Sequence, residues 1–242
     1  MRSVGRMTTF VFIPGAGGDA WYWHRVAAEL TARGHEAISV DLPAEDDKAG
    51  LPEYADAVDA AVGERAEPVL VALSLGGFTA AAVAARRPVA GIVFVNAMIP
   101  LPGETASAWG EVTGSAEARR ELALRQGRDP DADVDLRADF FQDVPEDLIA
   151  YALSHDRDES ERIFGDPCVF EAWPAVPIRV LTGRDDRMFP AVFQQRVARE
   201  RLGVEAELLP GGHLVPLSHP VEVADLVERS GTASTAPDCA TD

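Results

Sequence analysis

The stretch that most constrains the fold is residues 69–78, with the sequence VLVALSLGGF. Its first five residues are all apolar, which is typical of a strand buried on both faces of a parallel sheet. The alanine-rich residues 79–85 predict a helix. Ser74 therefore stands at a sharp turn from strand to helix, and this turn requires small residues two positions before and after it. Ala72 and Gly76 meet that requirement, although a serine in such a turn can also be purely structural.

Apolar β-type runs alternate with helical patterns in both halves of the chain. The expected strands are 8–13, 37–40, 69–73, 91–96, 178–182 and 205–209. The expected helices are 21–33, 51–62, 79–85, 191–201 and 220–229. Alternation at this short spacing predicts an α/β fold, with a mostly parallel sheet and helices on both faces.

Residues 104–170 interrupt the alternation. They contain helical fragments, several prolines, and 17 Asp or Glu against 7 Arg. An insertion of this length predicts a helical cap, or lid, over the strand ends. A disordered acidic loop is the alternative, and apolar residues such as Trp109, Phe140 and Phe141 argue against it. The predicted division is a core of residues 8–103 and 171–229, a cap of residues 104–170, and a disordered tail of residues 230–242.

Composition excludes several classes of function. The net charge of −18 would repel nucleic acid and anionic membranes. No apolar stretch approaches the roughly 20 residues that span a bilayer, and the N-terminus lacks the apolar region of a secretion signal. Two cysteines, Cys168 and Cys239, form no disulfide framework, so we expect a reduced, cytoplasmic setting. The expected partner is a small molecule, a homodimer is left open, and nothing indicates a metal or organic cofactor.

A serine nucleophile needs a base, and the base needs an orienting acid. His213 follows the expected strand 205–209 through two glycines, which would bring it to the sheet edge where Ser74 lies. His219, at the start of the last helix, is the alternative base. The other three histidines are expected in a helix, in a structural turn at the opposite edge, and in the cap: His24, His35 and His155.

Two adjacent aspartates compete for the role of the acid. Asp185 and Asp186 both follow the expected strand 178–182. Asp186 is favoured, because its spacing from Gly183 lets its carboxylate turn inward while Asp185 faces solvent. Ser74, Asp186 and His213 then occur in the chain order nucleophile, acid, base, and this order distinguishes one group of Ser-His-Asp enzymes from the others.

An oxyanion hole needs two backbone N–H groups beside the serine. Leu75, directly after the nucleophile, is expected to supply one. Ala16, in the glycine-rich turn after the first strand, is expected to supply the other. A simple turn or a phosphate loop is the alternative for residues 14–18, but the segment lacks the sequence patterns of nucleotide-binding loops.

Taken together, these residues resemble the α/β-hydrolase superfamily, and within it the small methylesterases and hydroxynitrile lyases. The resemblance rests on short motifs between about residues 9 and 225: Gly15-Ala16, residues 21–24, Gly34-His35, residues 41–43, residues 74–77, residues 96–100, Gly103-Glu104, Asp186 with Phe193-Gln194, residues 211–213 and residues 217–220. The chain departs from the pattern at Pro14, where the group usually has His, and at Ala72, where it usually has Gly. Neither position supplies a reacting atom.

The resemblance implies a carboxylesterase-like serine hydrolase that cleaves an ester or lactone of a small, largely apolar substrate through an acyl-enzyme on Ser74. The related lyases have Lys directly after the catalytic His and Thr in the oxyanion loop, where this chain has Leu214 and Gly15. Hydrolysis is therefore favoured. We expect substrate contacts from Gly15, Trp23, Asn96 and Leu214. A non-hydrolytic lyase or cyclase on the same scaffold, and a ligand receptor that keeps the triad, are the alternatives.

Overall fold

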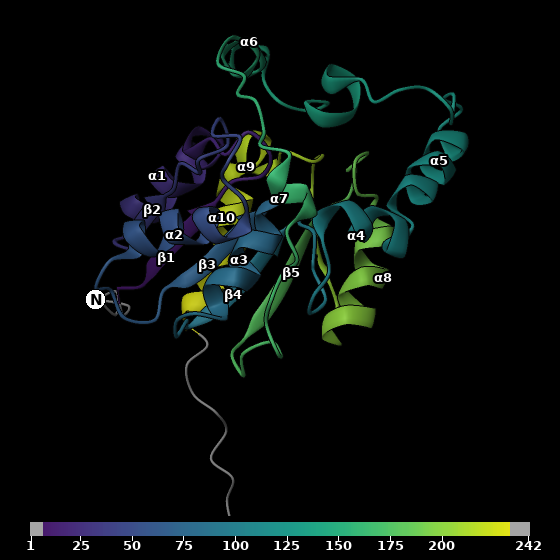
Figure 1. The fold of residues 1–242 in the computed structure, drawn as a ribbon. Helices are drawn as coiled ribbons and strands as arrows, with labels where there is room; N and C mark the ends of the chain where they lie inside the picture. Colours follow the sequence, from purple (N-terminus) through teal and green to yellow (C-terminus); the bar gives the residue numbers. More distant parts are fainter. Residues whose placement is uncertain (1–6, 233–242) are drawn as a thin grey trace, which may run out of the picture.

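The structure, a computed structural model, describes residues 7–232. Its centre is a six-stranded parallel sheet in the order β2-β1-β3-β4-β5-β6 (Figure 1). The strands are β1 (Thr9–Ile13), β2 (Glu36–Ser39), β3 (Val69–Leu73), β4 (Gly91–Val95), β5 (Ile178–Gly183) and β6 (Glu207–Leu209). The chain thus has the predicted α/β fold, in which the carboxyl ends of parallel strands meet at one edge of the sheet.

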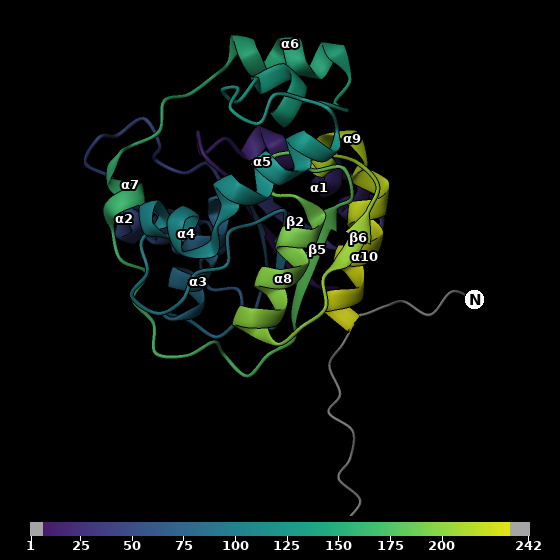
Figure 2. The same cartoon turned by 90° about the vertical axis from the view of Figure 1, so that its right-hand side faces the viewer.

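Helices cover both faces of the sheet (Figure 2). One face packs against α1 (His24–Ala32) and α10 (Pro220–Thr232), and the other packs against α2 (Leu51–Val62), α3 (Gly76–Ala84) and α8 (Ala191–Leu202). Side chains alternate along a strand. Val69 and Val71 therefore join the apolar cluster on the face of α1 and α10, while Leu70 and Ala72 join the cluster on the face of α2, α3 and α8. Burial of β3 on both faces follows, as its uninterrupted apolar sequence predicts.

Several element boundaries differ from those expected. The expected helix 21–33 is divided into the 3-10 helix η1 (Ala20–Trp23) and α1. α3 begins at Gly76 instead of residue 79, directly after the turn that contains Ser74. The prediction that the tail begins at residue 230 is wrong, because α10 extends to Thr232. The rest of that prediction, residues 233–242, lies outside the described residues, as does Cys239.

Residues 104–170, the cap, are largely helical, so the prediction of helical structure holds against the disordered alternative. The elements are α4 (Ala106–Thr113), α5 (Ser115–Arg125), the π-helical turn η2 (Leu136–Phe140), α6 (Glu146–Ser154) and α7 (Arg162–Gly165). α5, η2 and α6 lie beyond the strand ends in Figure 1. The Tyr151 ring of α6 stacks on Trp21 of η1 with centroids 4.6 Å apart, which fastens α6 to the core.

The first and last parts of the cap pack into the core. Trp109 of α4 is 1% exposed, and its indole N–H donates to the Ile99 carbonyl at 3.0 Å. Ile163 and Cys168 join the same apolar cluster as β3 and α3. The cap was expected to begin at residue 104, but α4 packs against the core. The part of the chain that stands apart from the core therefore begins after α4.

No helix of residues 7–232 is long and apolar enough to cross a membrane. A cytoplasmic location and a homodimer stay predictions from the sequence.

The Cys168 thiol is expected to be inert in the native protein. The residue is fully buried and contacts the Phe78 carbonyl at 3.7 Å. Burial, with a smaller contribution from Glu104, raises the pKa of the thiol to about 12, and a protonated thiol is a poor nucleophile. In a Cys239→Ser variant, Ellman's reagent should label no thiol in native buffer and one thiol in urea. Rapid labelling in native buffer would contradict this burial.

Candidate active site

Ser74 lies at the turn between β3 and α3, with φ at +50°. This left-handed conformation is uncommon for a residue other than glycine and is typical of functional turns. The chain around the turn is tightly packed: a Cβ on Gly76 would lie 2.3 Å from the Pro14 carbonyl oxygen, and one on Gly77 would lie 1.8 Å from the Met98 carbonyl oxygen. The Ala72 methyl group is accommodated in the buried core of β3. The serine itself is half-buried.

His213 and Asp186 form a buried pair beyond the ends of β6 and β5. His213 Nδ1 lies 2.9 Å from Asp186 Oδ2, and the two residues are 1% and 0% exposed. The other carboxylate oxygen, Oδ1, accepts from the backbone N–H groups of Met188 at 2.8 Å and Phe189 at 2.9 Å. The neighbouring Asp185 side chain is exposed. The structure therefore joins Asp186, the favoured acid, to the favoured base.

Ser74 Oγ forms no hydrogen bond with His213 within residues 7–232. A Cβ built on Gly15 would lie 2.9 Å from Ser74 Cβ and 3.5 Å from Ser74 Oγ, so the hydroxyl lies beside the glycine-rich loop. Catalytic hydrogen bonds are often long before substrate binds. The absence of this hydrogen bond among the described residues therefore does not exclude a serine–histidine interaction with substrate bound.

Asn96 was expected to contact substrate, and this expectation is wrong. Its side chain is fully buried. Its amide N–H groups donate to the carbonyl oxygens of Gly212 (2.9 Å) and His213 (2.8 Å), and its Oδ1 accepts from the Gly183 N–H at 2.7 Å. Asn96 thus joins the loop after β5 to the loop after β6, and it positions the His213–Asp186 pair.

Trp23 and Leu214 also belong to the framework. Trp23 is fully buried, its indole N–H donates to the Ile13 carbonyl at 3.1 Å, and its ring lies 4.9 Å from that of Phe12. Leu214 is 1% exposed within the same apolar cluster. Neither presents a surface to a ligand, so both expected substrate contacts are wrong. Gly15 borders Ser74, and its lack of a side chain leaves room for the serine side chain.

The two expected oxyanion donors have unoccupied N–H groups. Among residues 7–232, the backbone N–H groups of Ala16 and Leu75 donate to no protein acceptor. The loop around Ala16 is closed by a hydrogen bond from the Gly18 N–H to the Gly15 carbonyl at 3.1 Å. That carbonyl belongs to the same peptide unit as the Ala16 N–H. The hydrogen bond therefore polarises the peptide unit and makes the Ala16 N–H a stronger donor to an anion.

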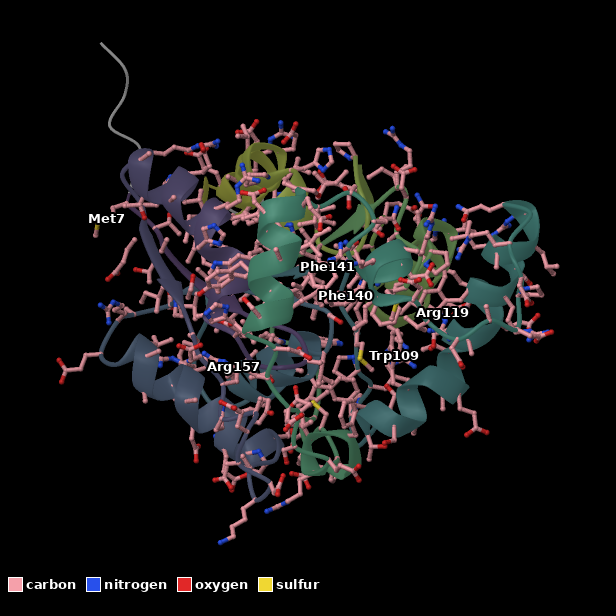
Figure 3. All side chains as sticks on the ribbon, turned by 90° about the horizontal axis from the view of Figure 1, so that it is seen from above. Met7, Trp109, Arg119, Phe140, Phe141 and Arg157 are labelled. Atoms are coloured by element: carbon pink, nitrogen blue, oxygen red, sulfur yellow. The ribbon has the colours of Figure 1, made fainter. Side chains whose placement is uncertain are left out.

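A pocket of about 250 Å³ lies between the glycine-rich loop of residues 14–18 and the cap. Its walls are mostly apolar and come from both sides: Ala16, Gly17, Asp19 and Tyr22 of the core, Leu136, Phe140, Phe141, Ala152, Leu153, His155, Asp156, Arg157 and Glu159 of the cap, and Met188. Figure 3, a view down onto the cap, labels Phe140, Phe141 and Arg157 beside α6. The Phe140 ring lies 5.0 Å from that of His213, which connects the pocket to the base.

Most of these pocket residues carry no signal in the sequence that marks them as functional. Phe140 and Phe141 were noticed only as apolar residues able to pack. Tyr22 was marked only as part of the motif at residues 21–24, without a role, and nothing marked Met188. Burial, with smaller contributions from Asp156 and Asp19, raises the pKa of Tyr22 to about 12. The phenol therefore keeps its proton at neutral pH and offers the pocket a hydrogen-bond donor.

His219 and His35 do not take part in the pair with Asp186. His219 Nδ1 is 2.9 Å from Ser218 Oγ and 3.5 Å from Asp143 Oδ2, at the start of α10. His35 contacts the Thr8 N–H and the Glu228 carboxylate, which fits its expected structural role. In the described part of the chain, no group of three His, Cys, Asp or Glu residues could hold a metal ion.

Comparisons with known proteins agree with this architecture. The curated relatives include "Probable esterase PIR7A" from Oryza sativa subsp. indica, which is 45% identical over 109 residues (39% of this chain, 41% of the relative), and "Methylesterase 7" from Arabidopsis thaliana, which is 35% identical over 104 residues (38% of this chain, 40% of the relative). The matched stretch thus spans about two fifths of those relatives.

Among solved structures, polyneuridine aldehyde esterase superposes with a TM-score of 0.76 at 20% identity, over 93% of this chain and 99% of that one. The pyrethroid hydrolase PytH superposes with a TM-score of 0.75 at 21% identity, over 94% and 98% of the two chains. The sequence profile described as "Alpha/beta hydrolase family" matches residues 10–226. This chain belongs to the alpha/beta hydrolase family.

Proposed function

We propose that this protein is a serine hydrolase that cleaves a carboxylic ester or lactone through an acyl-enzyme on Ser74. The observation that carries the proposal is the buried His213–Asp186 pair, which follows β6 and β5 at the same sheet edge where the Ser74 turn follows β3. The rice esterases and the Arabidopsis methylesterase among its relatives support ester hydrolysis as the reaction class.

In the proposed mechanism, His213 Nε2 takes the Ser74 proton as the serine oxygen attacks the carbonyl carbon of the ester. Asp186 accepts from Nδ1–H, which fixes the tautomer and stabilises the imidazolium. The N–H groups of Ala16 and Leu75 bind the oxyanion of the tetrahedral intermediate. His213 then protonates the departing alcohol and leaves an acyl-Ser74 ester. Water, deprotonated by His213, attacks that ester and releases the carboxylic acid.

The pocket between the oxyanion loop and the cap supports a small, largely apolar substrate. Its apolar wall includes Leu136, Phe140 and Leu153, with the Tyr22 hydroxyl as a neutral polar group. Apolar burial would provide most of the binding free energy, and the polar group would orient the substrate. Leu214 follows His213 in a buried position, so it places no cation beside the base to stabilise a departing anion, and hydrolysis is favoured over lyase chemistry.

We expect a fluorophosphonate probe to form a covalent adduct on Ser74, located by mass spectrometry of the digested protein. The same preparation should hydrolyse short p-nitrophenyl esters in a panel of esters, lactones and amides, with uptake of one water per product. Ser74→Ala is the matched control and should give neither adduct nor hydrolysis. Hydrolysis that survives this substitution, or substrate conversion without water uptake, would overturn the proposal.

A further inference from the structure

Three side chains of the cap reach the main chain directly beside the three catalytic groups. Glu159 Oε2 accepts from the Gly17 N–H at 2.8 Å, next to Ala16. Asp143 Oδ2 accepts from the Gly212 N–H at 3.0 Å, next to His213. Gln142 Nε2 donates to the Asp185 carbonyl at 2.7 Å, next to Asp186. Each contact thus lies one residue away from an expected oxyanion donor, the base or the acid.

We propose that the cap positions three catalytic loops, with Glu159, Asp143 and Gln142 as positioning residues. The loops are the oxyanion loop after β1 (residues 14–18), the base loop after β6 (residues 210–214) and the acid loop after β5 (residues 184–190). This inference rests on the proposed hydrolase function and goes beyond it, because it gives the cap a role in catalysis in addition to lining the pocket.

The Glu159 side chain is fixed by contacts with residues outside the oxyanion loop. Its Oε1 accepts a hydrogen bond from the Tyr54 hydroxyl of α2, and the neighbouring Ser160 hydroxyl donates to the buried Ala49 carbonyl at 2.6 Å. Arg157, the nearby cation, pairs with Asp41 at 3.1 Å. The Glu159 carboxylate is therefore a fixed acceptor in a half-buried setting.

The oxyanion loop has little else to hold it. Gly17 and Gly18 have φ values of +81° and +63° and no side chains of their own. Apart from its internal turn, the loop is tied by the Leu42 N–H, which donates to the Gly18 carbonyl at 2.8 Å, and by the Glu159 contact. Because glycines have the most backbone freedom to lose, removal of the carboxylate should let Ala16 N–H move off the oxyanion position.

The base loop is packed just as closely against the cap. A Cβ on Gly212 would lie 2.7 Å from Gln142 Cγ, and one on Gly211 would lie 2.5 Å from Asp143 Oδ2. These glycines are what allow the two cap side chains to approach. Within residues 7–232, Asp143 Oδ1 and Gln142 Oε1 are buried without a hydrogen-bond partner. Apolar residues would fill the same space without burying unpaired oxygens, so packing alone does not explain polar side chains here.

The experiment compares Glu159→Ala with Glu159→Gln, and Asp143→Ala with Asp143→Asn. The controls are Glu161→Ala and Asp147→Ala, both at exposed cap positions. The readouts are kcat, KM, Tm and the rate at which the fluorophosphonate labels Ser74. Removal of one oxyanion donor lowers kcat by about 10²–10³-fold. A donor that is displaced but not removed should lower kcat by at least about tenfold.

We expect each alanine variant to lower kcat and the labelling rate with little change in KM. The amide variants should recover most of the loss, because their side-chain oxygen can still accept from Gly17 or Gly212. The controls should match the wild type. The inference is overturned if the alanine variants keep the wild-type kcat and labelling rate, if only KM or Tm changes, or if the amide variants lose as much as alanine. If the wild type hydrolyses no ester but the labelling rate follows this pattern, the positioning role stands and the proposed function fails.

Discussion

Replacing Asp186 with asparagine is expected to lower kcat for ester hydrolysis by about 10⁴-fold, the cost measured when the acid of a Ser-His-Asp protease is replaced in this way. The expected loss is this large because the substitution reverses the hydrogen bond to the base. In the wild type, Asp186 Oδ2 accepts from His213 Nδ1. An amide N–H in that place would donate to Nδ1 and leave the proton on Nε2, the nitrogen that must accept from Ser74.

The side-chain amide of the Asp186→Asn variant cannot restore the hydrogen bond by rotating so that its oxygen faces His213. Oδ1 of Asp186 accepts from two backbone donors, the N–H groups of Met188 at 2.8 Å and Phe189 at 2.9 Å. An amide NH₂ placed there would face two donors, so the oxygen stays on that side and the NH₂ group faces His213. The fold should be preserved, because the loop keeps both of its backbone hydrogen bonds.

The matched control is Asp185→Asn, which makes the same chemical change one residue away on an exposed side chain. It should leave kcat close to the wild-type value. Steady-state kinetics on one short ester would give kcat for both variants, and circular dichroism would show whether each is folded. If the two variants retain equal activity, Asp186 does not orient the base.

The sheet, and the edge of it at which Ser74, Asp186 and His213 lie, were predictable because their signals are local. An uninterrupted apolar run gave β3, and small residues on both sides marked the turn at Ser74. The loops after β5 and β6 meet because neighbouring parallel strands end at one edge. The choice of Asp186 over Asp185 followed from its distance to Gly183, since one residue decides which carboxylate turns inward.

The roles of Trp23 and Asn96 were not predictable from local pattern. An aromatic residue in a short helix after the oxyanion loop can face either the pocket or the core, and here the Ile13 carbonyl takes the indole N–H. Asn96 follows a buried strand, as functional polar residues often do, but its three partners lie 87, 116 and 117 residues away. Only the folded arrangement brings such partners together.

The cap residues that contact the catalytic loops were not predictable for the same reason. The cap's acidic composition left a disordered loop as the alternative, and most of its carboxylates are exposed. Glu159 and Asp143 are half-buried instead, and their partners, Gly17 and Gly212, are 142 and 69 residues away. Composition describes the average residue of such a segment and not the few that reach the catalytic loops.

Removal of the Asn96 side chain is expected to produce the largest loss of stability of any substitution at the site. Asn96→Ala leaves the Gly183 N–H and the Gly212 and His213 carbonyls without their partner. A buried polar group left unpaired costs about 1–3 kcal/mol, so the free energy of unfolding should fall by about 3 kcal/mol or more. Urea unfolding would measure the change.

The backbone at Asn96 separates two contributions to that loss. Its φ is +45°, a region that asparagine and glycine tolerate better than alanine. Asn96→Gly loses the same three hydrogen bonds without the backbone penalty, so it should be more stable than Asn96→Ala by about 1 kcal/mol. Both variants should also lower kcat by about 10²-fold, because a shift of 1 Å in the reacting groups costs that much.

Asn96→Asp tests whether the orientation of the hydrogen bonds matters. An aspartate can still accept from the Gly183 N–H, but its second oxygen faces the Gly212 and His213 carbonyls, which are also acceptors. Repulsion and burial should raise the pKa of Asp at position 96 above its unfolded value. Relative to the wild type at the same pH, this variant should be least destabilised below about pH 4, where the carboxyl is protonated in both states. The difference should grow as pH rises through the raised pKa. A pH-independent difference would mean that the link between the loops after β5 and β6 depends on the shape of Asn96 and not on its donors.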